Sequence, residues 1–260
     1  MYGETLDSKD RLDLAIVAII LVTVSFAGCV QEELTVGETH NQEFYQEFEP
    51  TADTELIVKG INAAIEVTSW DGDNIRFHYQ ETSRGDKADL DLVEVIIIEE
   101  GDTIIIEERH KGKVSDVSVL FQFHVPPYLS VPSVTSKNGA ISISGLRSDM
   151  EVKTMNGAIS LDDVRGSVVA STSNGGIGTR VLSLEGDIRL SSGNGALRVH
   201  IANELDAELS VVTGNGLVNV EGLDLITTHT TTKRLEGTLN EGGHLIWCET
   251  GNGAIDLVGI

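Results

Sequence analysis

The sequence predicts an all-β protein whose main part is a parallel β-solenoid with coils of about 18–21 residues. Three observations lead to this prediction. The dipeptide Asn-Gly recurs, and its first five copies, beginning at Asn138, are spaced by 18, 18, 20 and 21 residues. Short runs of alternating apolar and polar residues flank the copies, as is typical of strands with one buried face. Glycine occurs 27 times and only 5% of the residues are aromatic, a composition that suits short strands and frequent turns.

An apolar segment near the N-terminus is interpreted as an export signal. Residues 14–28 are uncharged and are short for a membrane helix, which needs about 20 residues, but they match the central region of a secretory signal. The segment ends in Phe26-Ala27-Gly28 before Cys29. This end resembles the bacterial lipobox, which implies cleavage before the cysteine and lipidation of its sulfur. An uncleaved membrane anchor and a secretory signal cleaved elsewhere are the alternatives, and all three place the rest of the chain outside the cytoplasm.

The chain divides by composition into four segments. Residues 1–28 form the signal or anchor, and residues 29–50 are polar and acidic, as expected of a tether between a membrane and a domain. Residues 51–130 contain irregular strands, which we expect to extend the sheets of the solenoid and to cap its N-terminal end. A separate sandwich-like domain is the alternative for this third segment. Residues 131–260 hold the Asn-Gly repeat.

Several strands are expected in the irregular segment before the repeat. Asn62-Ala63 looks like a degenerate repeat turn with Ala in place of Gly, and residues 70–74 form a polar turn. Gly101-Asp102 separates two apolar runs that are expected to pair. The alternation of residue types places strands at 56–58, 64–67, 75–79, 94–100, 103–108 and 119–125.

Each Asn-Gly pair is expected to form the turn between two strands of one coil. The pair is the strongest short-range signal for positive φ, and equivalent Asn side chains would stack as a hydrogen-bonded ladder with the strand spacing of about 4.8 Å. Glu236-Gly237 follows Asn215 by 21 residues and is taken as a seventh turn. A ladder of β-hairpins is the alternative architecture. The six pairs are Asn138 and Gly139, Asn156 and Gly157, Asn174 and Gly175, Asn194 and Gly195, Asn215 and Gly216, and Asn252 and Gly253.

The order of these features resembles a known family. A Trp-Asp-Gly-Asp turn begins at Trp70, a Val-Pro-Pro segment begins at Val125, and Thr/Ser-x-Asn-Gly-x-Ile coils continue to the end. Over about residues 50–260 the chain resembles the candidate adhesins, a family of exported bacterial and archaeal β-solenoid domains long catalogued as a domain of unknown function. The resemblance implies a parallel, right-handed β-helix, an exported location and no catalytic residues. Residues 175–179 lack the second apolar residue of the pattern, which predicts a local irregularity.

No residue pattern in the sequence predicts a catalytic, cofactor or metal site. Asp162-Asp163 and Asp187 fall at expected turns, where aspartate is common. The seven histidines are scattered, without metal-ligand spacing within one element. Residues 71–74 are interpreted as a turn rather than as a weak Ca²⁺ site. Cys248 lies in an apolar strand and is expected to be a buried structural thiol.

These features favour a non-enzymatic module at the cell surface. We expect an extracellular binding or structural protein, held at the membrane through Cys29 or an anchor, with a surface glycan or protein as a further partner. The net charge of −23 argues against nucleic acid as a partner. The alternative is a carbohydrate-active β-helix enzyme, which would need three or more charged side chains converging in a groove. A passive envelope component without a specific ligand is a third hypothesis.

Overall fold

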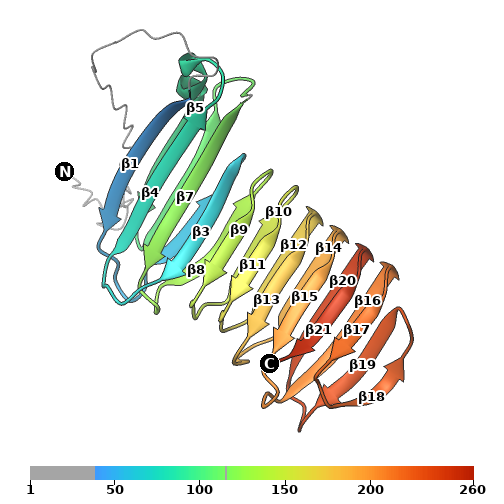
Figure 1. Cartoon of the computed structure of the whole chain (residues 1–260). Coiled ribbons are helices and arrows are strands. Elements are labelled where there is room, and N and C mark those ends of the chain that lie inside the picture. The colour runs from blue at the N-terminus through green and yellow to red at the C-terminus, as the bar shows by residue number, and fades with distance from the viewer. Residues whose placement is uncertain (1–38, 115) are drawn as a thin grey trace, which may run out of the picture.

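The computed structural model describes residues 39–114 and 116–260, which form two long β-sheets facing each other (Figure 1). The signal segment and Cys29 lie outside the described residues. One 3-10 helix, η1 (Lys87–Leu92), lies beside the strands at the N-terminal end of the stack. The all-β class predicted from the sequence is confirmed.

The two sheets contain 21 strands in the described part of the chain. The ten-stranded sheet runs in the order β1 (His40–Phe48), β4 (Ile75–Ser83), β7 (Val117–Val125), β3 (Ala63–Ser69), β9 (Ile141–Ser144), β11 (Ile159–Asp162), β13 (Ile177–Val181), β15 (Leu197–Ile201), β21 (Ile255–Gly259) and β17 (Val218–Glu221). The eleven-stranded sheet runs in the order β18 (Leu225–Thr230), β19 (Arg234–Leu239), β16 (Ala207–Asn215), β20 (His244–Asn252), β14 (Ile188–Asn194), β12 (Val168–Asn174), β10 (Met150–Thr154), β8 (Ser130–Ser136), β2 (Glu55–Lys59), β6 (Thr103–His110) and β5 (Val93–Glu100).

Each coil of the repeat places one strand in each sheet. In β10, residues Met150, Val152 and Thr154 are buried while the intervening residues face solvent, which is the period of two that the sequence predicts. Equivalent strands pair in parallel and in register, so Asn174 lies opposite Asn194. The parallel pairing of the repeat strands excludes the hairpin ladder. Their inward-facing Val, Ile and Leu side chains form one continuous core between the sheets.

The chain order and the spatial order of the coils differ at the C-terminal end. The coil that contains β16 and β17 lies outermost, and the chain then forms the antiparallel strands β18 and β19 before it returns. The final coil, β20 and β21, inserts between β14/β15 and β16/β17 (Figure 1). The prediction that Glu236-Gly237 forms a seventh turn is therefore wrong. Both residues lie inside β19, where Glu236 pairs with Ser210, because this strand runs antiparallel to the coil beside it.

The strands before the repeat continue the same two sheets. β2 and β3 form the first coil and pair in parallel with β8 and β9. β5 and β6 form the predicted antiparallel pair around Gly101, which has a φ of +59°. Three buried phenylalanines pack together in the core at this end, where Phe77 stacks on Phe123 and meets Phe121 edge to face.

Two expectations for local structure are wrong. Part of the expected tether at 29–50 is a strand, because β1 pairs along its whole length with β4 through an antiparallel register. Its side chains alternate between half-buried and exposed, so the acidic residues of this strand lie on its exposed side. The expected irregularity at residues 175–179 is also missing. Thr179 takes the second inward position of β13 and is 7% exposed, and β13 pairs with both neighbours without a register shift.

Candidate functional site

The Asn turns meet in one column along an edge of the solenoid. Each side-chain amide nitrogen donates a hydrogen bond to the side-chain oxygen of the neighbouring Asn, towards the N-terminal end of the stack. Asn62 of the degenerate turn is the first member, and Asn252 stands between Asn194 and Asn215 because the last coil is inserted there. The Nδ2–Oδ1 distances are 2.9 Å for Asn138–Asn62, 2.8 Å for Asn156–Asn138, 2.9 Å for Asn174–Asn156, 3.0 Å for Asn194–Asn174, 2.8 Å for Asn252–Asn194 and 2.9 Å for Asn215–Asn252.

A second, buried ladder lies beneath the Asn ladder and was not among the features predicted from the sequence. In each coil the Ser or Thr two positions before the Asn donates its hydroxyl to a backbone carbonyl of the adjacent coil. For example, Thr154 donates to the Gly139 carbonyl at 2.9 Å, and Thr250 donates to the Gly195 carbonyl at 2.8 Å. The Ser/Thr in the Ser/Thr-x-Asn-Gly motif was the available signal. These hydroxyls satisfy carbonyls that the buried turn would otherwise leave without a partner.

The glycines of the turns are needed for close packing rather than for positive φ. Among the described residues, positive φ occurs at other glycines, such as Gly145 and Gly166, so the conformational reason expected for the Asn-Gly pairs is wrong. A Cβ atom on Gly157 would lie 2.1 Å from the Gly139 carbonyl oxygen, and one on Gly195 would lie 2.0 Å from the Gly175 oxygen. Only glycine allows adjacent turns to stack at this distance.

Replacing Asn194 by alanine is expected to lower the free energy of unfolding by about 1 kcal/mol, the typical net contribution of such hydrogen bonds. Asn194 donates to Asn174 and accepts from Asn252, so the substitution interrupts the ladder in its middle. Thermal or urea unfolding measures the change, with Ser173→Ala, at an exposed position next to the ladder, as the control. An unfolding curve identical to that of the parent protein would show that the Asn ladder does not stabilise the fold.

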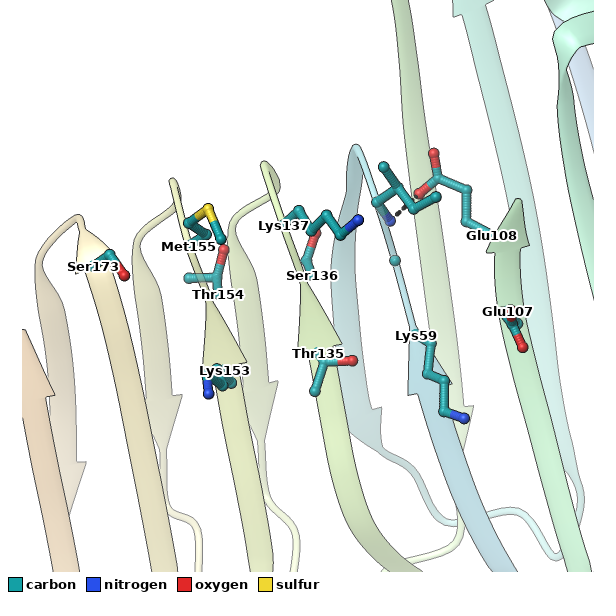
Figure 2. Close-up of a pocket in the computed structure, with 12 residues that line it drawn as sticks. Lys59, Glu107, Glu108, Thr135, Ser136, Lys137, Lys153, Thr154, Met155 and Ser173 are labelled. Atoms are coloured by element: carbon teal, nitrogen blue, oxygen red, sulfur yellow. Dashed lines mark hydrogen bonds between the residues drawn. The ribbon is translucent and has the colours of Figure 1, made fainter. Parts of the chain in front are cut away.

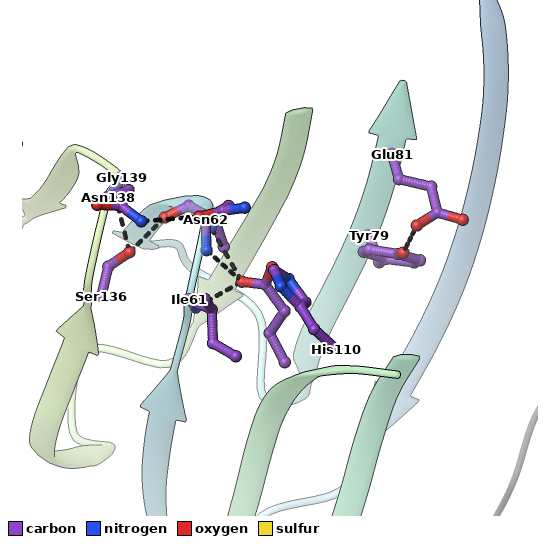
Figure 3. A network of polar contacts seen from close by, with 10 residues as sticks. Ile61, Asn62, Tyr79, Glu81, His110, Ser136, Asn138 and Gly139 are labelled. Carbon is purple, nitrogen blue, oxygen red and sulfur yellow. Dashed lines mark hydrogen bonds and ion pairs between the residues drawn. The ribbon is translucent and has the colours of Figure 1, made fainter. Parts of the chain in front are cut away.

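Glu108 closes the N-terminal end of the column, where Figure 3 shows Ile61 and Asn62 of the first turn beside His110. The first turn, Ile61 to Ala63, has no Asn turn of the repeat before it in the stack. Glu108 on β6 reaches this turn, and its Oε2 accepts the backbone N–H groups of Ile61, Asn62 and Ala63 at 2.6, 2.9 and 3.0 Å. Its other oxygen lies 2.6 Å from Nε2 of His110, and the carboxylate is fully buried. One buried carboxylate thus replaces the acceptors that a preceding coil would have supplied.

A second buried carboxyl group, Glu81, lies in the same N-terminal part of the solenoid (Figure 3). It is 1% exposed and forms a short hydrogen bond with the hydroxyl of Tyr79, which is also buried. Burial raises the pKa of Glu81 from 4.5 to about 7, and repulsion from Asp91 and Glu108 adds to this increase, while the Tyr79 hydrogen bond opposes it. Burial also raises the pKa of Tyr79, with a further contribution from the charge of Glu81.

Glu81 is expected to make the fold less stable as the pH rises. A carboxyl group whose pKa is raised in the folded state stabilises the fold below its unfolded pKa, and this contribution is lost as the pH rises through the folded pKa of about 7. Between pH 5 and pH 8 the free energy of unfolding should fall by about 2 kcal/mol relative to Glu81→Gln, which cannot ionise. Urea unfolding of both proteins across this range measures the difference. Parallel pH profiles would contradict the assignment.

The eleven-stranded sheet carries an open groove of about 450 Å³ on its outer face, beside the Asn column (Figure 2). We name it the lysine groove, because Lys59, Lys137 and Lys153 line it and all three are exposed. Strand pairing sets their positions: Lys59 and Lys153 both lie opposite Thr135, on either side of β8. The other lining residues are Gly60, Ile61, Glu107, Glu108, Thr135, Ser136, Thr154, Met155 and Ser173.

The two carboxylates of the groove are already committed to other groups. Arg109 lies 2.9 Å from Glu107 and lowers the pKa of that carboxyl group, mainly through their hydrogen bond. Glu108 is held by the three backbone N–H groups of the first turn. Neither carboxylate is therefore arranged as the acid or base of a paired glycosidase site. The lysines supply the remaining charge of the groove.

Other residues singled out in the sequence take structural positions. Cys248 is fully buried, and burial raises the pKa of its thiol to about 12, which makes it inert as a nucleophile. Asp162 pairs with Arg180 across adjacent coils at 2.6 Å. No group of three or more His, Cys, Asp or Glu residues able to hold a metal ion occurs in residues 39–114 and 116–260. Within the same ranges no helix has the length and apolar character to cross a membrane.

Comparisons with known proteins found a matching family model and several similar solved structures. A family model described as Toastrack DUF4097 matches residues 113–258. The crystal structure of a candidate cell adhesion protein from Clostridium sporogenes ATCC 15579 superposes with a TM-score of 0.52 at 11% identity, covering 85% of this chain and 100% of the other. A candidate adhesin from Bacteroides fragilis NCTC 9343 gives a TM-score of 0.32 at 9% identity, covering 83% and 97%. No curated protein matches the chain.

Proposed function

This chain belongs to the Toastrack DUF4097 family, and from that premise we propose that it is a non-enzymatic, adhesin-like binding module at the cell surface. The outer face of its repeat carries the proposal. In the ten-stranded sheet, Ser142, Ser160 and Gly178 lie side by side on consecutive strands and face outward. Small residues repeated in this way present a flat, regular face that suits many weak contacts with an extended partner. We also propose that this solenoid winds as a right-handed coil, as the family resemblance implies.

We propose that the N-terminal segment directs the export of the protein to the outside of the cell. Residues 14–28 and Cys29 carry the sequence pattern of an exported and lipidated protein. In this proposal the lipid on Cys29 holds the solenoid at the membrane. Cys29→Ser should then move the protein from the membrane fraction to the medium. Retention in the membrane fraction would favour an uncleaved anchor instead.

The binding role is tested by two measurements. Deletion of the gene should reduce adhesion of the cells, and the full chain purified in detergent should bind a component of the cell envelope in a screen of glycans and surface proteins. Normal adhesion together with an empty screen would contradict the proposed function and favour a passive envelope component. A defect in envelope integrity without a defect in adhesion would also favour a passive envelope component.

A carbohydrate-active enzyme is the second candidate, because the lysine groove brings several charged side chains together. The geometry favours binding over catalysis, since Glu107 is paired with Arg109 and Glu108 is buried against backbone N–H groups. We expect polygalacturonate, an acidic polysaccharide, to keep its length when it is incubated with the protein. The appearance of shorter chains, lost in a Lys59→Gln variant, would establish the enzyme instead.

A further inference from the structure

Most arginines of the described residues are paired with a carboxylate, whereas among the described lysines the one ion pair is Lys111–Glu94. Eight arginines of the described residues each form an ion pair with a carboxylate, so their charge is neutralised locally. Lys59, Lys137 and Lys153 form no ion pair with any residue in the same described ranges. The arginine pairs are Arg76–Glu47, Arg109–Glu107, Arg147–Glu185, Arg165–Asp163, Arg180–Asp162, Arg189–Asp187, Arg198–Asp256 and Arg234–Glu236.

Three of the six described lysines without an ion pair, Lys59, Lys137 and Lys153, are gathered in one place. Lys59 and Lys153 flank Thr135 in a single row across β2, β8 and β10, which separates their backbones by about 10 Å, or two strand spacings. Lys137 lies two residues beyond Thr135, at the rim next to the Asn column (Figure 2). Like charges at neighbouring positions of a sheet repel one another. The net charge of −23 offers many carboxylates. Glu107 lies opposite Lys59 on β6 but forms its ion pair with Arg109, and no described carboxylate forms an ion pair with the three lysines.

We propose that the lysine groove binds the carboxylates of an acidic polysaccharide. This inference rests on the proposed function, because it names the ligand class of the same surface module. Ammonium groups on separate side chains, whose backbones lie about 10 Å apart for Lys59 and Lys153, suit charges carried singly along an extended polymer better than one compact dianion. Lysine acts as a point charge that can meet such groups on a flexible chain.

The shape of the groove fits the same ligand. It is open, so a polymer can pass along it without entering a closed cavity. The Met155 side chain, which is 52% exposed, offers an apolar surface to a sugar ring next to Lys137 and Lys153. Nucleic acid is the less suitable polyanion, because its dense backbone charge would be repelled by the acidic surface around the groove.

The test compares polygalacturonate with its methyl ester, which has the same chain without the charges. Binding of the full chain in detergent should be detectable for polygalacturonate, weaker for the ester, and reduced by salt. The triple variant Lys59→Gln, Lys137→Gln, Lys153→Gln should bind about tenfold more weakly, from three lost charge pairs. The control variant Lys87→Gln, Lys113→Gln, Lys233→Gln removes the same charge elsewhere and should stay within about twofold. Thermal melts of both variants check that they fold.

Three results would overturn the inference. Equal loss in the two triple variants would show that only net charge matters, and equal binding of the ester would show that carboxylates are not recognised. Equal affinity for duplex DNA would show a general polyanion site. If polygalacturonate does not bind but another envelope component does, the inference fails while the proposed function stands. If no envelope component binds and adhesion is normal, the proposed function fails as well.

Discussion

Replacing Gly195 by alanine is expected to lower the free energy of unfolding by about 3 kcal/mol, at the upper end of what overpacking of a core typically causes. The new Cβ would lie 2.0 Å from the Gly175 carbonyl oxygen and 2.4 Å from its carbon. Both atoms belong to the backbone of the adjacent turn, so no side chain can rotate away. The turns would have to separate, which would strain the Asn194–Asn174 bond and the Ser192 hydroxyl bond to the Gly175 carbonyl. Urea unfolding measures the loss.

Gly178→Ala is the matched control for this experiment. Gly178 faces outward from β13 in a neighbouring coil, and no atom lies within 4 Å of the Cβ that alanine would add. The same chemical change should therefore alter stability by less than about 0.5 kcal/mol, or increase it slightly, because alanine restricts the unfolded chain. Similar losses for the two variants would refute the close-packing explanation of the turn glycines.

Replacing Glu108 by alanine is also expected to lower the free energy of unfolding by about 3 kcal/mol. Three backbone N–H groups, those of Ile61, Asn62 and Ala63, would lose their common acceptor at a buried position. His110 would lose its partner at 2.6 Å as well. Because these contacts close the first coil, the loss should be concentrated there. The variant should therefore raise the hydrogen-exchange rate of the Ile61–Ala63 amides more than the exchange rates of amides in the later coils.

Glu107→Ala provides the comparison for Glu108. The two residues are neighbours on β6, but Glu107 faces the surface and pairs with the half-exposed Arg109. Exposed pairs of this kind contribute about 0.2–1 kcal/mol. If the two alanine variants unfold at the same urea concentration, Glu108 does not stabilise the first coil through its backbone hydrogen bonds.

The sequence alone determined the repeating part of the fold. The spacing of the Asn-Gly pairs and the alternation around them predicted the coils, because both depend on short-range regularities that every repeat shows. The same patterns located Asn62 as a degenerate turn and predicted the β5–β6 pair around Gly101. The family model matches residues 113–258. This range lies within about residues 50–260, over which the sequence resembles the family.

Only the tertiary structure decided how the coils meet. The final coil inserts between two earlier coils, and Glu236 lies in an antiparallel strand, because spatial neighbours are chosen by packing and not by order along the chain. The need for glycine in the turns depends on a carbonyl of another coil, and the role of Glu108 depends on a turn more than forty residues away in sequence. The lysine groove arises in the same way, since strand pairing alone brings Lys59 to the same row as Lys153. Such contacts leave no periodic signal in the sequence, and so the ends of the solenoid and its candidate binding site became visible only in three dimensions.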